Sequence, residues 1–94
     1  MLIEKTTTET VKQTVELNLP AYYKHSEDDF YKICEGGIVN VTSRIITARP
    51  TSFLFQSDVE SIVSKGTEIN EKDFNSALDR TLTSINLIAE RQTA

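Results

Sequence analysis

Two adjacent glycines, Gly36 and Gly37, separate two short runs of mainly apolar residues, 30–35 and 38–41. Glycine readily adopts the positive φ angles of a two-residue hairpin turn, so the pair predicts an antiparallel hairpin. With only the glycines in the loop, Cys34 lies opposite Val39 and Lys32 opposite Val41. One face, the predicted core, then carries Phe30, Cys34, Val39, Val41 and Ile45. The other face carries Tyr31, Ile33, Ile38, Asn40, Thr42, Arg44 and Ile46.

Further strands are expected on both sides of the hairpin. Residues 11–19 alternate apolar and polar side chains up to Pro20, which is typical of a strand with one buried face. Residues 21–24 are expected to be extended, residues 25–29 to form a solvated turn, and residues 52–56 to form a short strand after Pro50 ends the one that begins at 38. Nothing before Thr10 indicates a packed element, so we expect residues 1–9 to be frayed.

Two helices are predicted in the C-terminal part of the chain. Ser57 and Glu60 have the spacing of a capping box, and Lys65-Gly66 forms a stop signal, which gives a short helix over 58–65. Asn70 caps a second helix over 71–91. Its apolar stripe is Phe74, Ala77, Leu78, Thr81, Leu82, Ile85, Ile88 and Ala89.

This order predicts an α+β fold in one domain, 1–94. An antiparallel sheet of three to five strands is followed by a short helix and a longer C-terminal amphipathic helix packed on one sheet face. The other face is rich in isoleucine, so we expect a second copy of the chain to cover it. Leu87 lies off the helical stripe and adds a helix-side contact. The predicted dimer contacts are Ile33, Ile38, Ile46 and Leu87.

Composition excludes several classes of protein. The longest apolar runs have three residues, far short of the roughly 20 that span a bilayer, so no membrane span is expected. The N-terminus has no features of an export signal, and we expect a cytoplasmic protein. One cysteine cannot form an internal disulfide, and one cysteine with one histidine cannot make a four-ligand zinc site. We predict no metal and no cofactor.

The sequence offers little support for catalysis. The only histidine, His25, lies in the predicted turn, whereas Cys34 lies in a strand, and a nucleophile needs an oriented base on a rigid frame. The adjacent acids 27–29 lack the glycine of a calcium-binding loop. No catalytic residue is therefore predicted, and the protein is not expected to be an enzyme.

One cluster of residues is compatible with nucleic acid. Aromatic rings interleaved with cations on a sheet bind single strands by stacking and phosphate contact. The candidates are Tyr22, Tyr23, Lys24, Tyr31, Lys32 and Arg44. The chain has 14 acidic and 10 basic residues, a net charge of −4, which disfavours phosphate binding. The other interpretation is that these tyrosines bury their rings at a sheet edge.

The run Leu19 to His25, with residues 30–33 and a helix containing Phe74 and Leu78, resembles short orphan proteins of gut-bacterial phages and mobile elements. That resemblance implies a small accessory protein and no particular mechanism. The order of elements is similar to the PC4-like single-stranded-DNA-binding fold, which is dimeric. We therefore expect a non-enzymatic, homodimeric protein-interaction module, with a single-stranded nucleic-acid-binding protein as the alternative.

Overall fold

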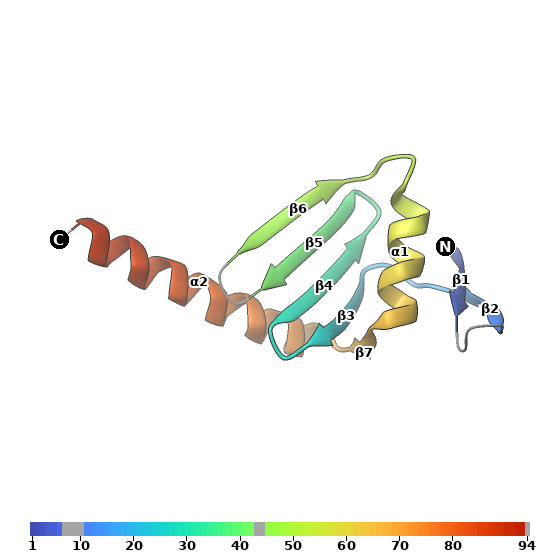
Figure 1. Ribbon diagram of the computed structural model, residues 1–94, viewed down its shortest axis with the longest axis horizontal. Helices are drawn as coiled ribbons and strands as arrows, with labels where there is room; N and C mark the ends of the chain where they lie inside the picture. The colour runs from blue at the N-terminus through green and yellow to red at the C-terminus, as the bar shows by residue number, and fades with distance from the viewer. Residues whose placement is uncertain (7–10, 43–44, 94) are drawn as a thin grey trace.

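The computed structural model describes residues 1–6, 11–42 and 45–93, with side chains up to residue 85. It confirms an α+β fold with a five-stranded antiparallel sheet, a separate two-stranded sheet and two helices (Figure 1). The elements are β1 (Leu2–Thr6), β2 (Lys12–Glu16), β3 (Ala21–Ser26), β4 (Asp29–Cys34), β5 (Gly37–Thr42), β6 (Ile46–Pro50), α1 (Phe55–Lys65), β7 (Thr67–Ile69) and α2 (Glu71–Thr93).

The glycine hairpin is confirmed, but its register differs from the predicted one. Cys34 lies opposite Gly37, so the turn is Glu35-Gly36 and the pairing is shifted by two residues. Gly37 has a φ of +148°, and a Cβ there would collide with the carbonyl oxygen of Arg49 on β6. Because a shift of two preserves the alternation of a strand, each residue of β4 and β5 stays on its predicted face.

The helix α2 packs on the face of the large sheet that carries Phe30 and Val41, as predicted. Phe74 and Ala77 are buried against these two residues and Tyr22. The rings of Tyr22 and Phe74 lie 5.5 Å apart between centroids. We call this surface the α2 face.

The opposite face of the sheet is covered by the same chain, which corrects the expectation that a second copy covers it. Ile33 and Ile38 are only 0% and 3% exposed, because they pack in one cluster with α1 and the N-terminal strands. Isoleucines buried within one chain cannot also contact a second copy. We call this surface the α1 face; its cluster also contains Ile3, Leu17, Ala21, Tyr23, Val59, Ile62 and Val63.

The N-terminal residues form a strand, so the prediction of frayed residues is wrong for 2–6. The strand β1 pairs with β2, and Ile3 is fully buried. The amide of Glu4 donates to Oε2 of Glu60 at 2.6 Å, and the amide of Thr6 donates to Oγ of Ser64 at 2.9 Å. Contacts with α1 thus order a polar segment whose own sequence gives little signal. Met1 also contradicts that prediction, because it forms backbone hydrogen bonds with Leu17, whereas residues 7–9 lie outside the described residues.

Two predictions between residues 38 and 56 are also wrong. The predicted strand from 38 to Pro50 is in fact two strands, β5 and β6, so Ile46 lies opposite Val41 on the α2 face and Ile45 is 57% exposed. The predicted strand at 52–56 is replaced by a turn and the start of α1. Because α1 begins at Phe55, Ser57 lies inside the helix and does not cap it.

The second predicted cap is confirmed. The amide of Asp73 donates to Oδ1 of Asn70 at 2.8 Å at the start of α2. Acidic Glu71 and Asp73 lie in the first turn, where the helix dipole favours negative charge.

Candidate interaction surface

The residues predicted to bind nucleic acid do not form one surface. Tyr22, Lys24 and Lys32 alternate onto the α2 face, whereas Tyr23 and Tyr31 lie on the α1 face. The rings of Tyr22 and Tyr23 are buried in the two cores, and Nζ of Lys32 lies 5.8 Å from the Tyr22 ring centroid. Arg44 lies outside the described residues. A stacking platform would need these rings exposed side by side.

His25 and Cys34 lie on opposite faces of the sheet. Nε2 of His25 is 3.0 Å from the carbonyl oxygen of Ile62, and its ring lies 4.7 Å from that of Tyr31 between centroids. Cys34 lies on the α2 face opposite Gly37. In the described parts of the chain, no three His, Cys, Asp or Glu side chains are arranged so that they could hold a metal ion.

A polar cluster on the α1 face holds Asp29 in place. Nδ2 of Asn40 donates to Oδ1 of Asp29 at 2.7 Å, and the hydroxyl of Tyr31 donates to Oδ2 at 3.4 Å. Burial, and then the neighbouring charge of Asp29, raise the pKa of Tyr31 above its usual value of 10.0. Because both carboxylate oxygens of Asp29 accept hydrogen bonds from side chains of the same chain, we interpret this cluster as structural.

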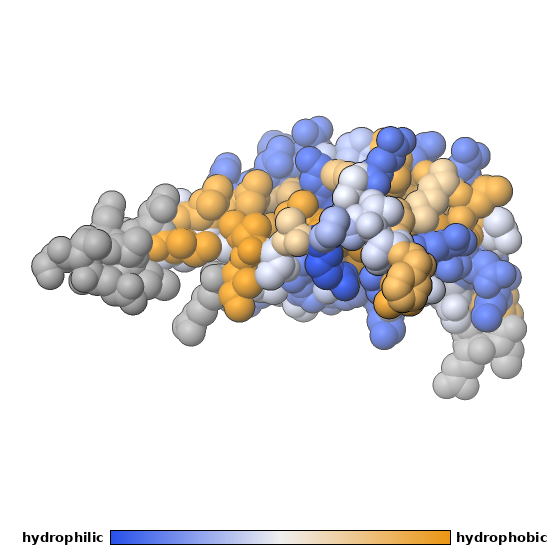
Figure 2. Space-filling model, turned by 90° about the horizontal axis from the view of Figure 1, so that it is seen from above, coloured by the Kyte–Doolittle hydropathy of each residue, from blue (hydrophilic) through white to orange (hydrophobic). Residues whose placement is uncertain are grey.

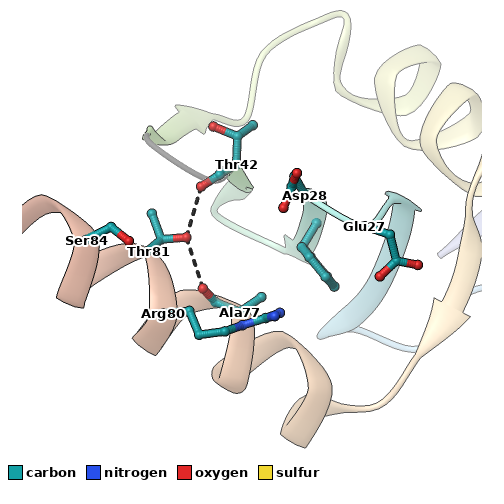
Figure 3. A pocket seen from close by; sticks show the side chains of 8 residues that line it. Glu27, Asp28, Thr42, Ala77, Arg80, Thr81 and Ser84 are labelled. Carbon is teal, nitrogen blue, oxygen red and sulfur yellow. Dashed lines mark hydrogen bonds between the residues drawn. The ribbon is translucent and has the colours of Figure 1, made fainter.

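A small pocket marks the place where α2 meets the end of the sheet. It is lined by charged and hydroxyl side chains, including Glu27, Asp28, Arg80 and Ser84 (Figure 3). The hydroxyl of Thr81 lies 2.9 Å from the carbonyl oxygen of Thr42 and 3.0 Å from that of Ala77. Thr81 is the last buried residue of α2 among the described side chains.

Beyond Thr81, α2 continues past the sheet to the C-terminus (Figure 1). We call residues 82–93 the projecting segment; at about 1.5 Å per residue it is roughly 18 Å long. The radius of gyration is 15.0 Å, compared with about 12 Å for a compact chain of this length. The molecule is therefore elongated, with a longest extent of 54 Å.

The base of the projecting segment is apolar. Leu82 is 43% exposed and Ile85 is partly exposed. Exposed Ile45 lies near this point of the helix. The carbonyl oxygen of Ile45 accepts a hydrogen bond from the amide of Thr42, and the carbonyl oxygen of Thr42 accepts one from the hydroxyl of Thr81. Figure 2 shows hydrophobic residues gathered where α2 leaves the sheet. Of the predicted dimer contacts, Ile46 lies half-buried on the α2 face, and the side chain of Leu87 lies outside the described residues.

A second apolar surface lies on the α2 face, beside the part that α2 covers. We call it the open strip; it consists of Cys34, Gly37, Val39, Ala48 and Pro50 on three neighbouring strands. Cys34 and Val39 are half-buried, and Ala48 and Pro50 are exposed. Sequence reasoning missed this surface, because it predicts one strand over residues 38–50 and therefore no pairing between β5 and β6.

Comparison with known proteins finds no matching family model, no matching curated protein and no matching solved structure. In the part of the chain that the structure describes, no helix has both the length and the hydropathy to cross a membrane. The molecule is a small α+β domain.

Proposed function

We propose that this chain is a non-enzymatic protein-interaction module that forms a homodimer through the projecting segment of α2. In keeping with the resemblance noted above, it would act in the cytoplasm as an accessory protein of a phage or mobile element. The observation that carries the proposal is the course of α2, which leaves its own sheet with apolar residues still on its surface.

Charge supports this interpretation. The chain has 24 charged residues in 94, yet none occurs over the nine residues Thr81–Ala89. A helix that faces water normally carries charged side chains on its solvent side, whereas the polar residues of this stretch, Thr81, Thr83, Ser84 and Asn86, are all uncharged. Each copy has a net charge of −4, so an uncharged contact also avoids bringing acidic groups together.

Helix stability supports it as well. Isolated helical segments shorter than about 12–15 residues are marginal in water and depend on packing for stability. The projecting segment continues α2 and needs no new nucleus, and a partner helix or sheet would supply the packing that stabilises most helices in proteins.

The test is the mass of the full chain in solution across a concentration series, measured by sedimentation velocity. We expect a dimer of about 21 kDa, twice the chain mass of 10.6 kDa, that dissociates on dilution. Leu82→Glu should give a folded monomer. Leu2→Glu is the matched control, because Leu2 is an exposed leucine on β1, and this variant should remain dimeric. A wild-type chain that stays monomeric at several hundred micromolar would refute the proposal.

Single-stranded nucleic acid is the alternative partner. It is tested by titrating a labelled oligonucleotide with the same samples at low and moderate salt. Saturable binding that weakens steeply with salt would support this alternative. Absence of binding, together with a dimer that Leu82→Glu disrupts, would support the protein-interaction module.

A further inference from the structure

We infer that the open strip of one copy receives the projecting segment of a second copy, and that the exchange is reciprocal. This inference rests on the proposed function and adds to it the surface on which the segment docks. It commits to a second copy of this chain as the occupant of both apolar surfaces.

The first argument is the continuity of α2. Phe74, Ala77 and Thr81 face the sheet along the first half of the helix. The apolar spacing continues in the sequence through Ile85 and Ile88, beyond the point where the chain's own sheet ends. The first half of the apolar stripe packs on a sheet. We therefore expect its second half to pack on a similar surface.

The second argument is the character of the open strip. It belongs to the same sheet face on which α2 already packs, with the same antiparallel strands and with Val39 two residues from buried Val41. The five residues of the open strip carry no charge, although Lys32 lies opposite Val39 on the same face and Arg49 also lines the hollow. The apolar side chains of the strip match the uncharged part of the projecting segment, residues 82–89.

The third argument is closure. Each copy has one projecting segment and one open strip. In a dimer with two-fold symmetry, both surfaces of both copies are therefore buried at once. A one-way arrangement would leave a free helix at one end and a free strip at the other, and it would continue into a chain of subunits. Reciprocal docking explains both exposed surfaces with a single contact.

The test uses two neighbouring exposed residues of β6 that lie on opposite faces. Ala48 lies opposite Val39 on the open strip, and Thr47 lies opposite Asn40 on the α1 face. We expect Ala48→Lys to raise the dissociation constant of the dimer about 100-fold, because a lysine would be buried there without a partner. Thr47→Lys adds the same charge and should leave the dimer unchanged. Circular dichroism and thermal unfolding show whether each variant remains folded.

Cys34, the only cysteine of the chain, provides a second measurement that needs no substitution in the sheet. Its thiol should react slowly with a maleimide in the wild-type dimer and faster in Leu82→Glu. A dimer that Leu82→Glu disrupts, but that tolerates Ala48→Lys and leaves Cys34 equally reactive, would overturn the docking site and leave the proposed function standing. A monomeric wild-type chain would overturn both.

Discussion

The two faces of the large sheet differ in how completely the chain covers them. On the α1 face, Ile33 and Ile38 are sealed by α1 and by the N-terminal strands. On the α2 face, the helix covers Phe30 and Val41 but leaves Val39 and its neighbours partly open. The α1 face is a buried core, whereas the α2 face leaves apolar residues exposed, as in a protein interface. Burial within the chain, more than hydrophobicity, decides which apolar residues remain available for a partner.

The largest effect is expected from shortening side chains on the two faces. Ile33→Ala should reduce the free energy of unfolding by about 3 kcal/mol, because it leaves a cavity in a sealed core. Val39→Ala, on the half-open strip, should cost about 1 kcal/mol. Urea unfolding at one fixed protein concentration measures both. Equal losses would contradict the distinction between the faces.

An intermediate effect is expected at the turn that sets the register between β4 and β5. Gly37→Ala should cost about 2 kcal/mol or more, since a positive φ is unfavourable for alanine and the new Cβ meets Arg49. Gly36→Ala is the matched control, because no atom lies within 4 Å of the position of its Cβ, and its effect should be below about 0.5 kcal/mol. If the two substitutions were equally costly, the strain at Gly37 would not be what fixes the register.

The smallest effect concerns pH and the α1 face. Burial, with the charges of Glu68 and Asp29 respectively, raises the pKa of Tyr23 and Tyr31 above 10.0 in the folded chain. The folded state then holds these protons more tightly than the unfolded state, so their contribution to stability is complete below pH 10 and is lost as pH rises through the folded pKa values. We expect the urea midpoint to fall as the pH rises above about 10. The fall should be shallower in a Tyr23→Phe, Tyr31→Phe double variant, and an equally steep fall in that variant would exclude the two tyrosines as its cause.

Local signals in the sequence predicted much of the fold. The hairpin, the Asn70 cap, the end of α1 near Gly66 and the amphipathic α2 all depend on a few neighbouring residues. The strand β1 could not be found in this way, because its amides are satisfied by side chains of Glu60 and Ser64 that lie 56 and 58 positions away. Its polar, threonine-rich surroundings gave no pattern to recognise.

The candidate surface was predicted only in part. The stripe of α2, including Leu82 and Ile85, follows from helical spacing alone. Helical spacing does not show which face of the sheet each helix covers. The prediction for Ile33 and Ile38 assumed that both helices pack in one layer on the same face. The fold instead places α1 and α2 on opposite faces, which moves the open apolar surface from the isoleucines to Val39 and Ala48.

The contact between β1 and α1 has a consequence for aggregation. The strand pairs with β2 on one side, and on its other side Glu60 and Ser64 accept hydrogen bonds from its amides. An unprotected strand edge of this kind is a template on which foreign strands can assemble into fibrils. Here a carboxylate and a hydroxyl occupy the donors that such a strand would use. The β1 edge of this small sheet is thereby protected against the addition of further strands by two helix side chains.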